Sequence, residues 1–166
     1  MLNEVLMRVF PMSKIPPDVA AFLSGKRIAV AGVSRTPPSP ANAIFRKLMA
    51  AGYEVIPLNP YAEVLESARC YADVTAIPGD IDGVVIATPP AAALSVVQQC
   101  AAKGVKWVWF HKSLDAGSVS DAALKEAKAL GLSVIAQGCP MMYVAPVDLG
   151  HKCIRWWMEM FGKGTG

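Results

Sequence analysis

Short apolar runs that alternate with helical patterns constrain the fold of this chain more than any other feature. Each run is about five residues long, rich in β-branched or aromatic side chains, and followed by glycine, proline or polar residues. Repeated strand–helix units predict a doubly wound α/β fold, because parallel strands require long crossover connections. The predicted strands are 27–31, 53–58, 83–87, 105–110 and 132–136.

Helices are predicted on both faces of this five-stranded parallel sheet, which gives a three-layer, Rossmann-like domain. Prolines and an acid begin the first helix, and glycines follow the ends of several others. The connection after the second strand differs: we expect at most a turn of helix over 61–69, a short extended piece at Cys70-Tyr71, and a helical turn at 74–78. The predicted helices are 16–23, 41–51, 91–103, 119–130 and 147–161.

Three parts of the chain differ in pattern. Residues 1–14 are a poorly patterned N-terminal extension, residues 15–146 carry the Rossmann-like domain, and residues 147–166 form a C-terminal helix and tail that we expect to pack on the same domain. The 166 residues suffice for one domain with a good core. Apolar residues make up 54% and charged residues 17%, which excludes a disordered chain and fits strands buried on both faces.

The composition also excludes several classes of function. The net charge is only +3, without a basic block, so we expect no nucleic-acid partner. No apolar run reaches the length of a membrane span, and Met1 to Phe10 lacks the long apolar core of a signal peptide. Four scattered cysteines and two histidines show no metal-ligand spacing, so we expect no metal. Unpaired cysteines favour a reducing compartment, and we expect a cytoplasmic protein.

Candidate binding residues follow the predicted strands. The carboxyl ends of parallel strands meet at one edge of a sheet, where α/β proteins bind ligands. This edge collects small residues, hydroxyls, prolines and cations, with almost no acids, so it suits a phosphorylated ligand. The candidates are Gly32, Val33, Ser34 and Arg35 after the first strand, Asn59 and Pro60 after the second, Thr88, Pro89 and Pro90 after the third, and His111, Lys112 and Ser113 after the fourth.

A nicotinamide or flavin dinucleotide is the first ligand to consider for such an edge. The fingerprint G-x-G-x-x-G would need glycines where Ser34 and Pro37 stand, and an acid where Asn59 stands. An NAD(P)-dependent oxidoreductase is therefore an alternative that the motif argues against.

The strand ends together resemble a known family. Gly32-Val33-Ser34, Val55 to Pro60, Thr88-Pro89-Pro90 and Gly138-Cys139-Pro140 are similar, in order and placement, to the coenzyme A-binding domain family. These are small stand-alone Rossmann-like proteins similar to the N-terminal domain of the succinyl-coenzyme A synthetase alpha subunit. The resemblance spans about residues 15–146 and implies a site for coenzyme A or an acyl-CoA at the strand ends.

The resemblance also assigns parts of the ligand to the candidate residues. It implies that the 32–35 loop lies against the phosphates, Asn59 and Pro60 near the adenosine, the 88–90 turn along the pantetheine arm, and the 111–113 loop against the ligand as well. Coenzyme A carries a pyrophosphate and a 3′-phosphate, with which the cations of the 32–35 and 111–113 loops can pair.

Three hypotheses about activity remain open. In the synthetase the phosphorylated histidine lies in a further domain, so we expect this chain to bind its ligand without catalysis. The second hypothesis is an enzyme that uses Cys139 for acyl transfer, with His111 or His151 as base, although a buried cysteine is more often an apolar filler. The third is an interaction module. One side of the C-terminal helix, which we expect to pack on the other helices, would then contact a second copy or a partner protein; its residues are Ile154, Trp157, Met158 and Phe161.

Overall fold

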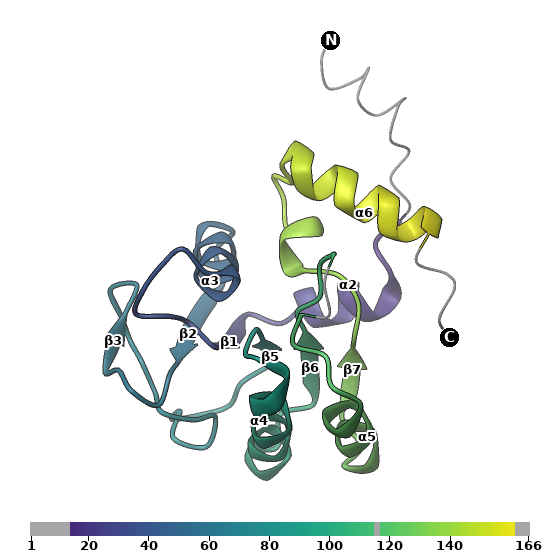
Figure 1. Ribbon diagram of the computed structural model, residues 1–166. Coiled ribbons are helices and arrows are strands. Elements are labelled where there is room, and N and C mark those ends of the chain that lie inside the picture. The colour runs from purple at the N-terminus through teal and green to yellow at the C-terminus, as the bar shows by residue number, and fades with distance from the viewer. Residues whose placement is uncertain (1–13, 115–116, 162–166) are drawn as a thin grey trace.

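The computed structural model describes residues 14–114 and 117–161 and contains a five-stranded parallel sheet (Figure 1). Its strands are β1 (Arg27–Ala31), β2 (Glu54–Leu58), β5 (Gly83–Ile86), β6 (Trp107–Phe110) and β7 (Ser133–Ile135). They lie in the order β2-β1-β5-β6-β7, so the direction of winding reverses between β1 and β5. The predicted five-stranded, Rossmann-like α/β fold is confirmed.

The two central strands are buried on both faces, which explains their continuous apolar sequence. Ile28, Ala29 and Val30 of β1 are 0% exposed, as are Val84 and Val85 of β5. In the register of the sheet, Ala31 at the end of β1 pairs with Leu58 of β2 and with Ile86 of β5. The three strands therefore end level with one another, and the residues that follow them start from one edge.

Helices cover the sheet in two layers (Figure 1). On one face, α2 (Pro17–Leu23) and α3 (Pro40–Ala50) share an apolar cluster with Ile28 and Val30. On the other face, α4 (Pro90–Lys103) and α5 (Asp121–Ala129) share a second cluster with Ala29 and Val84. Successive residues of β1 thus point into different clusters, as the two-residue period of a strand requires. This arrangement agrees with the predicted three layers.

A β-hairpin replaces the turn of helix predicted over 61–69. Strands β3 (Val64–Leu65) and β4 (Ala68–Arg69) pair antiparallel across a two-residue turn. Both turn residues have positive φ, 51° at Glu66 and 62° at Ser67, which is the conformation of a tight type I′ hairpin turn. Glutamate and serine are not typical of such a turn, so the sequence did not indicate it. The turn of helix expected over 61–69 was wrong.

Smaller differences concern the ends of elements. Ser120 accepts a hydrogen bond from the Ala123 N–H and is therefore the N-cap of α5, which begins at Asp121 and not at 119. A single turn of 3-10 helix, η1 (Pro140–Met142), follows β7. The last helix, α6 (Leu149–Phe161), begins two residues later than predicted.

The C-terminal helix packs through only part of the side that was predicted. Ile154 and Met158 pack against the core, but Trp157 is 49% and Phe161 62% exposed. The buried position is Arg155, which is 3% exposed and places its guanidinium 4.5 Å from the centre of the Tyr143 ring. With Arg155 directed inward, Trp157 and Phe161 of the predicted apolar side face outward. The division of the chain at residue 146 stays a prediction, and residues 1–13 and 162–166 lie outside the described part.

Within the described part of the chain, no helix combines the length and the apolar character that crossing a membrane requires. Nor do the described residues include a group of three or more His, Cys, Asp or Glu side chains placed to hold a metal ion.

Candidate functional site

The ends of β1 and β5 approach each other closely at the predicted site. Gly32 has φ +97°, and a Cβ at this position would lie 2.5 Å from the Ala87 carbonyl oxygen. The Gly32 N–H donates to the Leu58 carbonyl on the other side, at 3.2 Å. Only glycine combines this backbone conformation with so close a neighbour. Gly32 therefore lets the turn after β1 lie directly against the residue before Thr88.

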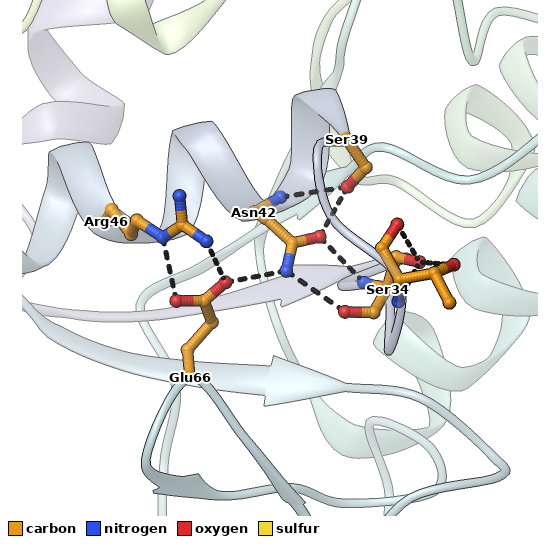
Figure 2. A network of polar contacts seen from close by, with 6 residues as sticks. Ser34, Ser39, Asn42, Arg46 and Glu66 are labelled. Carbon is orange, nitrogen blue, oxygen red and sulfur yellow. Dashed lines mark hydrogen bonds and ion pairs between the residues drawn. The ribbon is translucent and has the colours of Figure 1, made fainter.

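The loop after β1 is held by one buried side chain, Asn42 on α3 (Figure 2). Asn42 is 2% exposed. Its Oδ1 accepts from the Ser34 N–H at 2.9 Å and from the Ser39 hydroxyl, while its Nδ2 donates to the Ser34 carbonyl at 3.0 Å. Ser39 is also the N-cap of α3 and accepts the Asn42 N–H. Asn42 thus joins the loop to the first turn of the helix.

The β3–β4 hairpin completes this network. Glu66 Oε1 accepts from Asn42 Nδ2 at 2.7 Å and from Arg46 Nη2 at 2.8 Å, and its Oε2 accepts from Arg46 Nε at 2.8 Å (Figure 2). Hydrogen bonds from Arg46, and then from Asn42, hold the pKa of the Glu66 carboxyl below its ordinary value. The Arg46 guanidinium donates to both carboxylate oxygens and so orients the Glu66 side chain, which supports Asn42.

This network changes what Ser34 can offer a ligand. Its N–H donates to Asn42 and is therefore not an open donor for phosphate, and its carbonyl accepts from the same side chain. Its hydroxyl accepts from the Thr36 N–H at 3.0 Å. Arg35, the next residue, is exposed. The loop is therefore ordered before any ligand arrives, with Arg35 as its charged group.

Asn59 supports the same loop from the second strand. Its Nδ2 donates to the Val33 carbonyl at 2.8 Å, and its Oδ1 accepts from the Tyr61 N–H at 2.8 Å. The amide is therefore engaged within the protein, and Pro60 beside it is exposed. Val33 itself is 0% exposed, so its side chain belongs to the core. Val33, Asn59 and Pro60 therefore shape the site, and the Pro60 side chain is the one of the three that is exposed.

The turn after β5 offers open hydrogen-bonding groups. Thr88 Oγ1 is buried and has no hydrogen-bond partner among the described residues. Pro89 occupies the N-cap position of α4, Pro90 its first turn, and no side-chain cap bond is present there. Pro89 and Pro90 have no N–H, and the Ala92 N–H donates to the Pro89 carbonyl at 3.0 Å, so the first turn of α4 offers few N–H donors beside the buried hydroxyl. The positive end of the helix still favours an anion, and the Thr88 hydroxyl can donate to it.

The loop after β6 lies beside the end of β5, because the His111 N–H donates to the Ile86 carbonyl at 2.9 Å. The Lys112 N–H donates to the Gly138 carbonyl at 3.0 Å, which ties this loop to the turn after β7. Lys112 is half-buried. The structure thus brings all four groups of predicted residues to one edge of the sheet.

A pocket of about 510 Å³ opens next to this edge. It lies between the first turn of α3, the loops after β6 and β7, and the start of α6. Two residues of the predicted site, His111 and Ser113, form part of its wall. The other lining residues are Pro40, Ala43, Leu114, Cys139, Met141 and His151.

One wall of this pocket carries a histidine with a carboxylate behind it. His151 Nδ1 lies 2.6 Å from Asp148 Oδ2, and Asp148 Oδ1 accepts the His151 N–H at 3.0 Å. Burial would raise the pKa of Asp148, but the hydrogen bonds from the backbone and ring of His151 outweigh it and lower that pKa. Burial raises the pKa of the Cys139 thiol to about 12, so the thiolate needed for acyl transfer is scarce at neutral pH.

Asn42, Glu66 and Asp148 are the functional candidates that the sequence did not indicate. A weak signal existed for Asn42, which follows the N-cap Ser39 by three residues, and for Asp148, which precedes a helix. Glu66 had none, because its role depends on a hairpin that brings it to α3 from 24 residues away.

Comparison with known proteins agrees with this geometry. The sequence profile described as "CoA binding domain" matches residues 26–145, most of the chain, including every strand end discussed above. This chain belongs to the CoA-binding domain family. The family that the strand ends resemble is thereby confirmed.

The curated relatives of this CoA-binding domain are much longer proteins. The chain is 34% identical over 92 residues to acetate–CoA ligase [ADP-forming] II of Archaeoglobus fulgidus, covering 54% of this chain and 14% of that protein. It is 29% identical over 125 residues to the alpha subunit of acetate–CoA ligase [ADP-forming] II of Pyrococcus furiosus, covering 71% of this chain and 27% of that subunit. The chain thus spans a minor part of each ligase.

Among solved structures, a small protein of similar length resembles this CoA-binding domain. A hypothetical protein from Pyrococcus horikoshii OT3 superimposes with a TM-score of 0.69 at 31% identity, covering 78% of this chain and 94% of that one. The fold of the domain therefore occurs both in ligases and as a separate chain.

Proposed function

We propose that this protein binds coenzyme A or an acyl-CoA at the carboxyl edge of its sheet, in the crevice between β1 and β5. The observation that supports this most is the turn after β5, where the buried Thr88 hydroxyl without a partner lies at the uncapped start of α4. An oxygen of an anionic ligand would accept a hydrogen bond from this hydroxyl, and the positive end of α4 would favour the ligand's negative charge. The edge lies where the strand order reverses, which is where α/β sheets hold nucleotides.

The predicted residues contribute to this site in different ways. Arg35 and Lys112 pair with the phosphates, and Gly32 lets the ligand approach the backbone. Val33, Ser34, Asn59 and Pro60 shape the loops toward the adenosine and phosphate end. Thr88, Pro89 and Pro90 lie along the pantetheine arm, which continues toward His111 and Ser113.

Calorimetric titration with coenzyme A, NAD and ATP tests this function. We expect coenzyme A to bind more tightly than the other two ligands. Arg35→Ala and Lys112→Ala should each weaken coenzyme A binding about tenfold, because each removes a charge-assisted hydrogen bond. Lys128→Ala, an exposed cation on α5, is the matched control and should leave the affinity unchanged. No heat with coenzyme A, or equal affinity for all three ligands, would contradict the proposal.

We further propose that the outward side of α6 contacts a second copy of this chain. Leu149, Trp157, Met160 and Phe161 are between 49% and 62% exposed there. Large apolar residues gathered on one helix favour an interface, and the same side chains can face their copies across a two-fold axis.

The four cysteines are all free, which supports placing this protein in a reducing compartment such as the cytoplasm.

Light scattering after size exclusion tests the α6 interface. The wild-type chain should have the mass of a dimer, and Trp157→Glu should convert it to a monomer with an unchanged circular dichroism spectrum. Leu130→Glu is the control, because Leu130, the C-cap residue of α5, is a similarly exposed apolar residue (44%). A wild-type chain that is monomeric at all concentrations would refute the interface.

A further inference from the structure

The pocket beside the sheet edge has walls suited to the acyl end of the ligand. Leu114, Met141 and Ala43 give it an apolar lining, and its volume of about 510 Å³ exceeds the needs of a bare thiol. His111 and Ser113, at the end of the proposed pantetheine path, form part of the same wall. A ligand that follows this path places its sulfur and any attached acyl group in the pocket.

The pocket also presents a paired acid–base group. His151 lines it, and Asp148 Oδ2 holds ring atom Nδ1 at 2.6 Å, so Nε2 is the ring nitrogen left for a ligand or a water molecule. A carboxylate behind an imidazole fixes the orientation of the ring and stabilises its protonated form. Capping of α6 requires only the bond from the His151 N–H to Asp148 Oδ1. The other carboxylate oxygen, Oδ2, can therefore bind the His151 ring.

We propose that this pocket hydrolyses the thioester of an aliphatic acyl-CoA, with His151 as catalytic general base and Asp148 as its positioning residue. The proposal rests on the proposed coenzyme A site and adds a reaction to it. His151 Nε2 takes a proton from water as the water oxygen attacks the thioester carbonyl carbon. The carbon–sulfur bond then breaks, and the proton passes from the imidazole to the departing thiolate. The products are a carboxylic acid and free coenzyme A thiol, so water is the only co-reactant.

The cysteine of the pocket does not take part in this reaction. Cys139 is 3% exposed, and its raised pKa keeps it as a neutral thiol. Cys139 forms part of the pocket wall as a small apolar side chain, which is the usual role of a buried cysteine. The Ser113 hydroxyl can donate to the carbonyl oxygen on which negative charge develops during attack.

Release of free thiol from hexanoyl-CoA, followed with a thiol-reactive dye, tests the reaction. Hydrolysis by the wild-type protein should exceed the uncatalysed rate, and hexanoyl-CoA should react faster than acetyl-CoA because its chain fills the apolar pocket. His151→Gln should lower kcat at least about a hundredfold, the usual scale of general-base catalysis. Lys128→Ala, the control of the binding experiment, should retain the activity.

Asp148→Asn separates the two roles of this carboxylate. Asparagine is also a good N-cap, so the helix and the thermal midpoint should be preserved. The variant lacks the carboxylate that orients and stabilises the imidazolium, so kcat should fall about a hundredfold while KM stays near the wild-type value. An Asp148 that served only as the helix cap would leave both the thermal midpoint and kcat unaltered in this variant.

Calorimetry on the same preparations distinguishes the two proposals. Coenzyme A binding without hydrolysis of either thioester would overturn the hydrolysis and leave the proposed function intact. Absence of both binding and hydrolysis would overturn the proposed function itself. A covalent acyl adduct on Cys139 or Ser113 in the mass spectrum would overturn direct attack by water.

Discussion

At the scale of single residues, the candidate site depends on two residues that offer no side-chain group to a ligand. Gly32 allows β1 and β5 to end side by side, and Asn42 holds the loop that follows. An asparagine with both amide atoms bonded is a rigid support, since no rotation of its side chain preserves all the bonds. The ligand therefore meets a preformed loop and loses less free energy to ordering it.

Replacement of Gly32 measures how much this close approach matters. Gly32→Ala should lower the free energy of unfolding by more than about 2 kcal/mol, because the methyl group meets the Ala87 carbonyl in addition to the strained φ. Gly52→Ala is the matched control: its φ is +90° and nothing lies within 4 Å of the added carbon, so only the strain of about 1 kcal/mol remains. Urea unfolding measures both. Equal losses would show that the contact with Ala87 is unimportant.

At the scale of elements, the small β3–β4 hairpin connects the second strand to the loop after the first. Its turn places Glu66 within reach of Asn42 and Arg46 on α3, although Glu66 is 24 and 20 residues from them in the sequence. The conformation is unfavourable for the residues that adopt it, since both have positive φ. The ion pair and the hydrogen bond offset part of that strain.

Relief of this strain should stabilise the protein. Ser67→Gly should raise the free energy of unfolding by about 0.5 to 1 kcal/mol, because glycine adopts a φ of 62° without steric cost. Coenzyme A affinity should stay the same. Ser95→Gly, in the middle of α4, makes the same chemical change in a helix and should destabilise by about 1 kcal/mol. A Ser67→Gly protein no more stable than wild type would mean that the turn is not strained.

At the scale of the whole molecule, carboxylates tie distant segments together. Asp82 Oδ2 accepts the backbone N–H groups of Lys26 and Arg27, both at 2.8 Å, and so joins the start of β1 to the segment before β5. These bonds, from Arg27 and then from Lys26, hold the pKa of Asp82 below its ordinary value. The pKa of Glu66 is lowered as well, by its own partners. The folded protein therefore favours both groups in their charged form.

Stability should consequently fall in acid. A carboxyl with a lowered folded pKa adds stability above its unfolded pKa of about 4, and that contribution disappears as the pH falls through the folded pKa. The thermal midpoint should drop between about pH 5 and pH 2. Asp82→Asn should lower the midpoint at pH 7 and flatten its decline in acid, as thermal melts across this range would reveal. An unchanged acid profile would show that Asp82 has the same pKa in the folded and unfolded chains.

Much of the architecture and the place of the site followed from local pattern. Runs such as Ile28 to Ala31 and Val84 to Ile86 are strands because they are apolar on both faces, and the residues after parallel strands must share an edge. That reasoning predicted Gly32, Thr88 and His111 as neighbours. The sequence by itself therefore determined the strand–helix units, the parallel sheet that they build, and the edge that the ends of its strands share.

Contacts between distant segments decided the rest. The bond from Asn42 to Glu66, the support of Ser34 by Asn42, and the burial of Arg155 against Tyr143 each join residues of different segments. The pocket around His151 likewise requires four elements to converge. A periodic pattern in the sequence indicates which residues of one segment face the core and which face solvent. The features named above depend instead on which segments the packed core brings together. Only the tertiary structure contains that information.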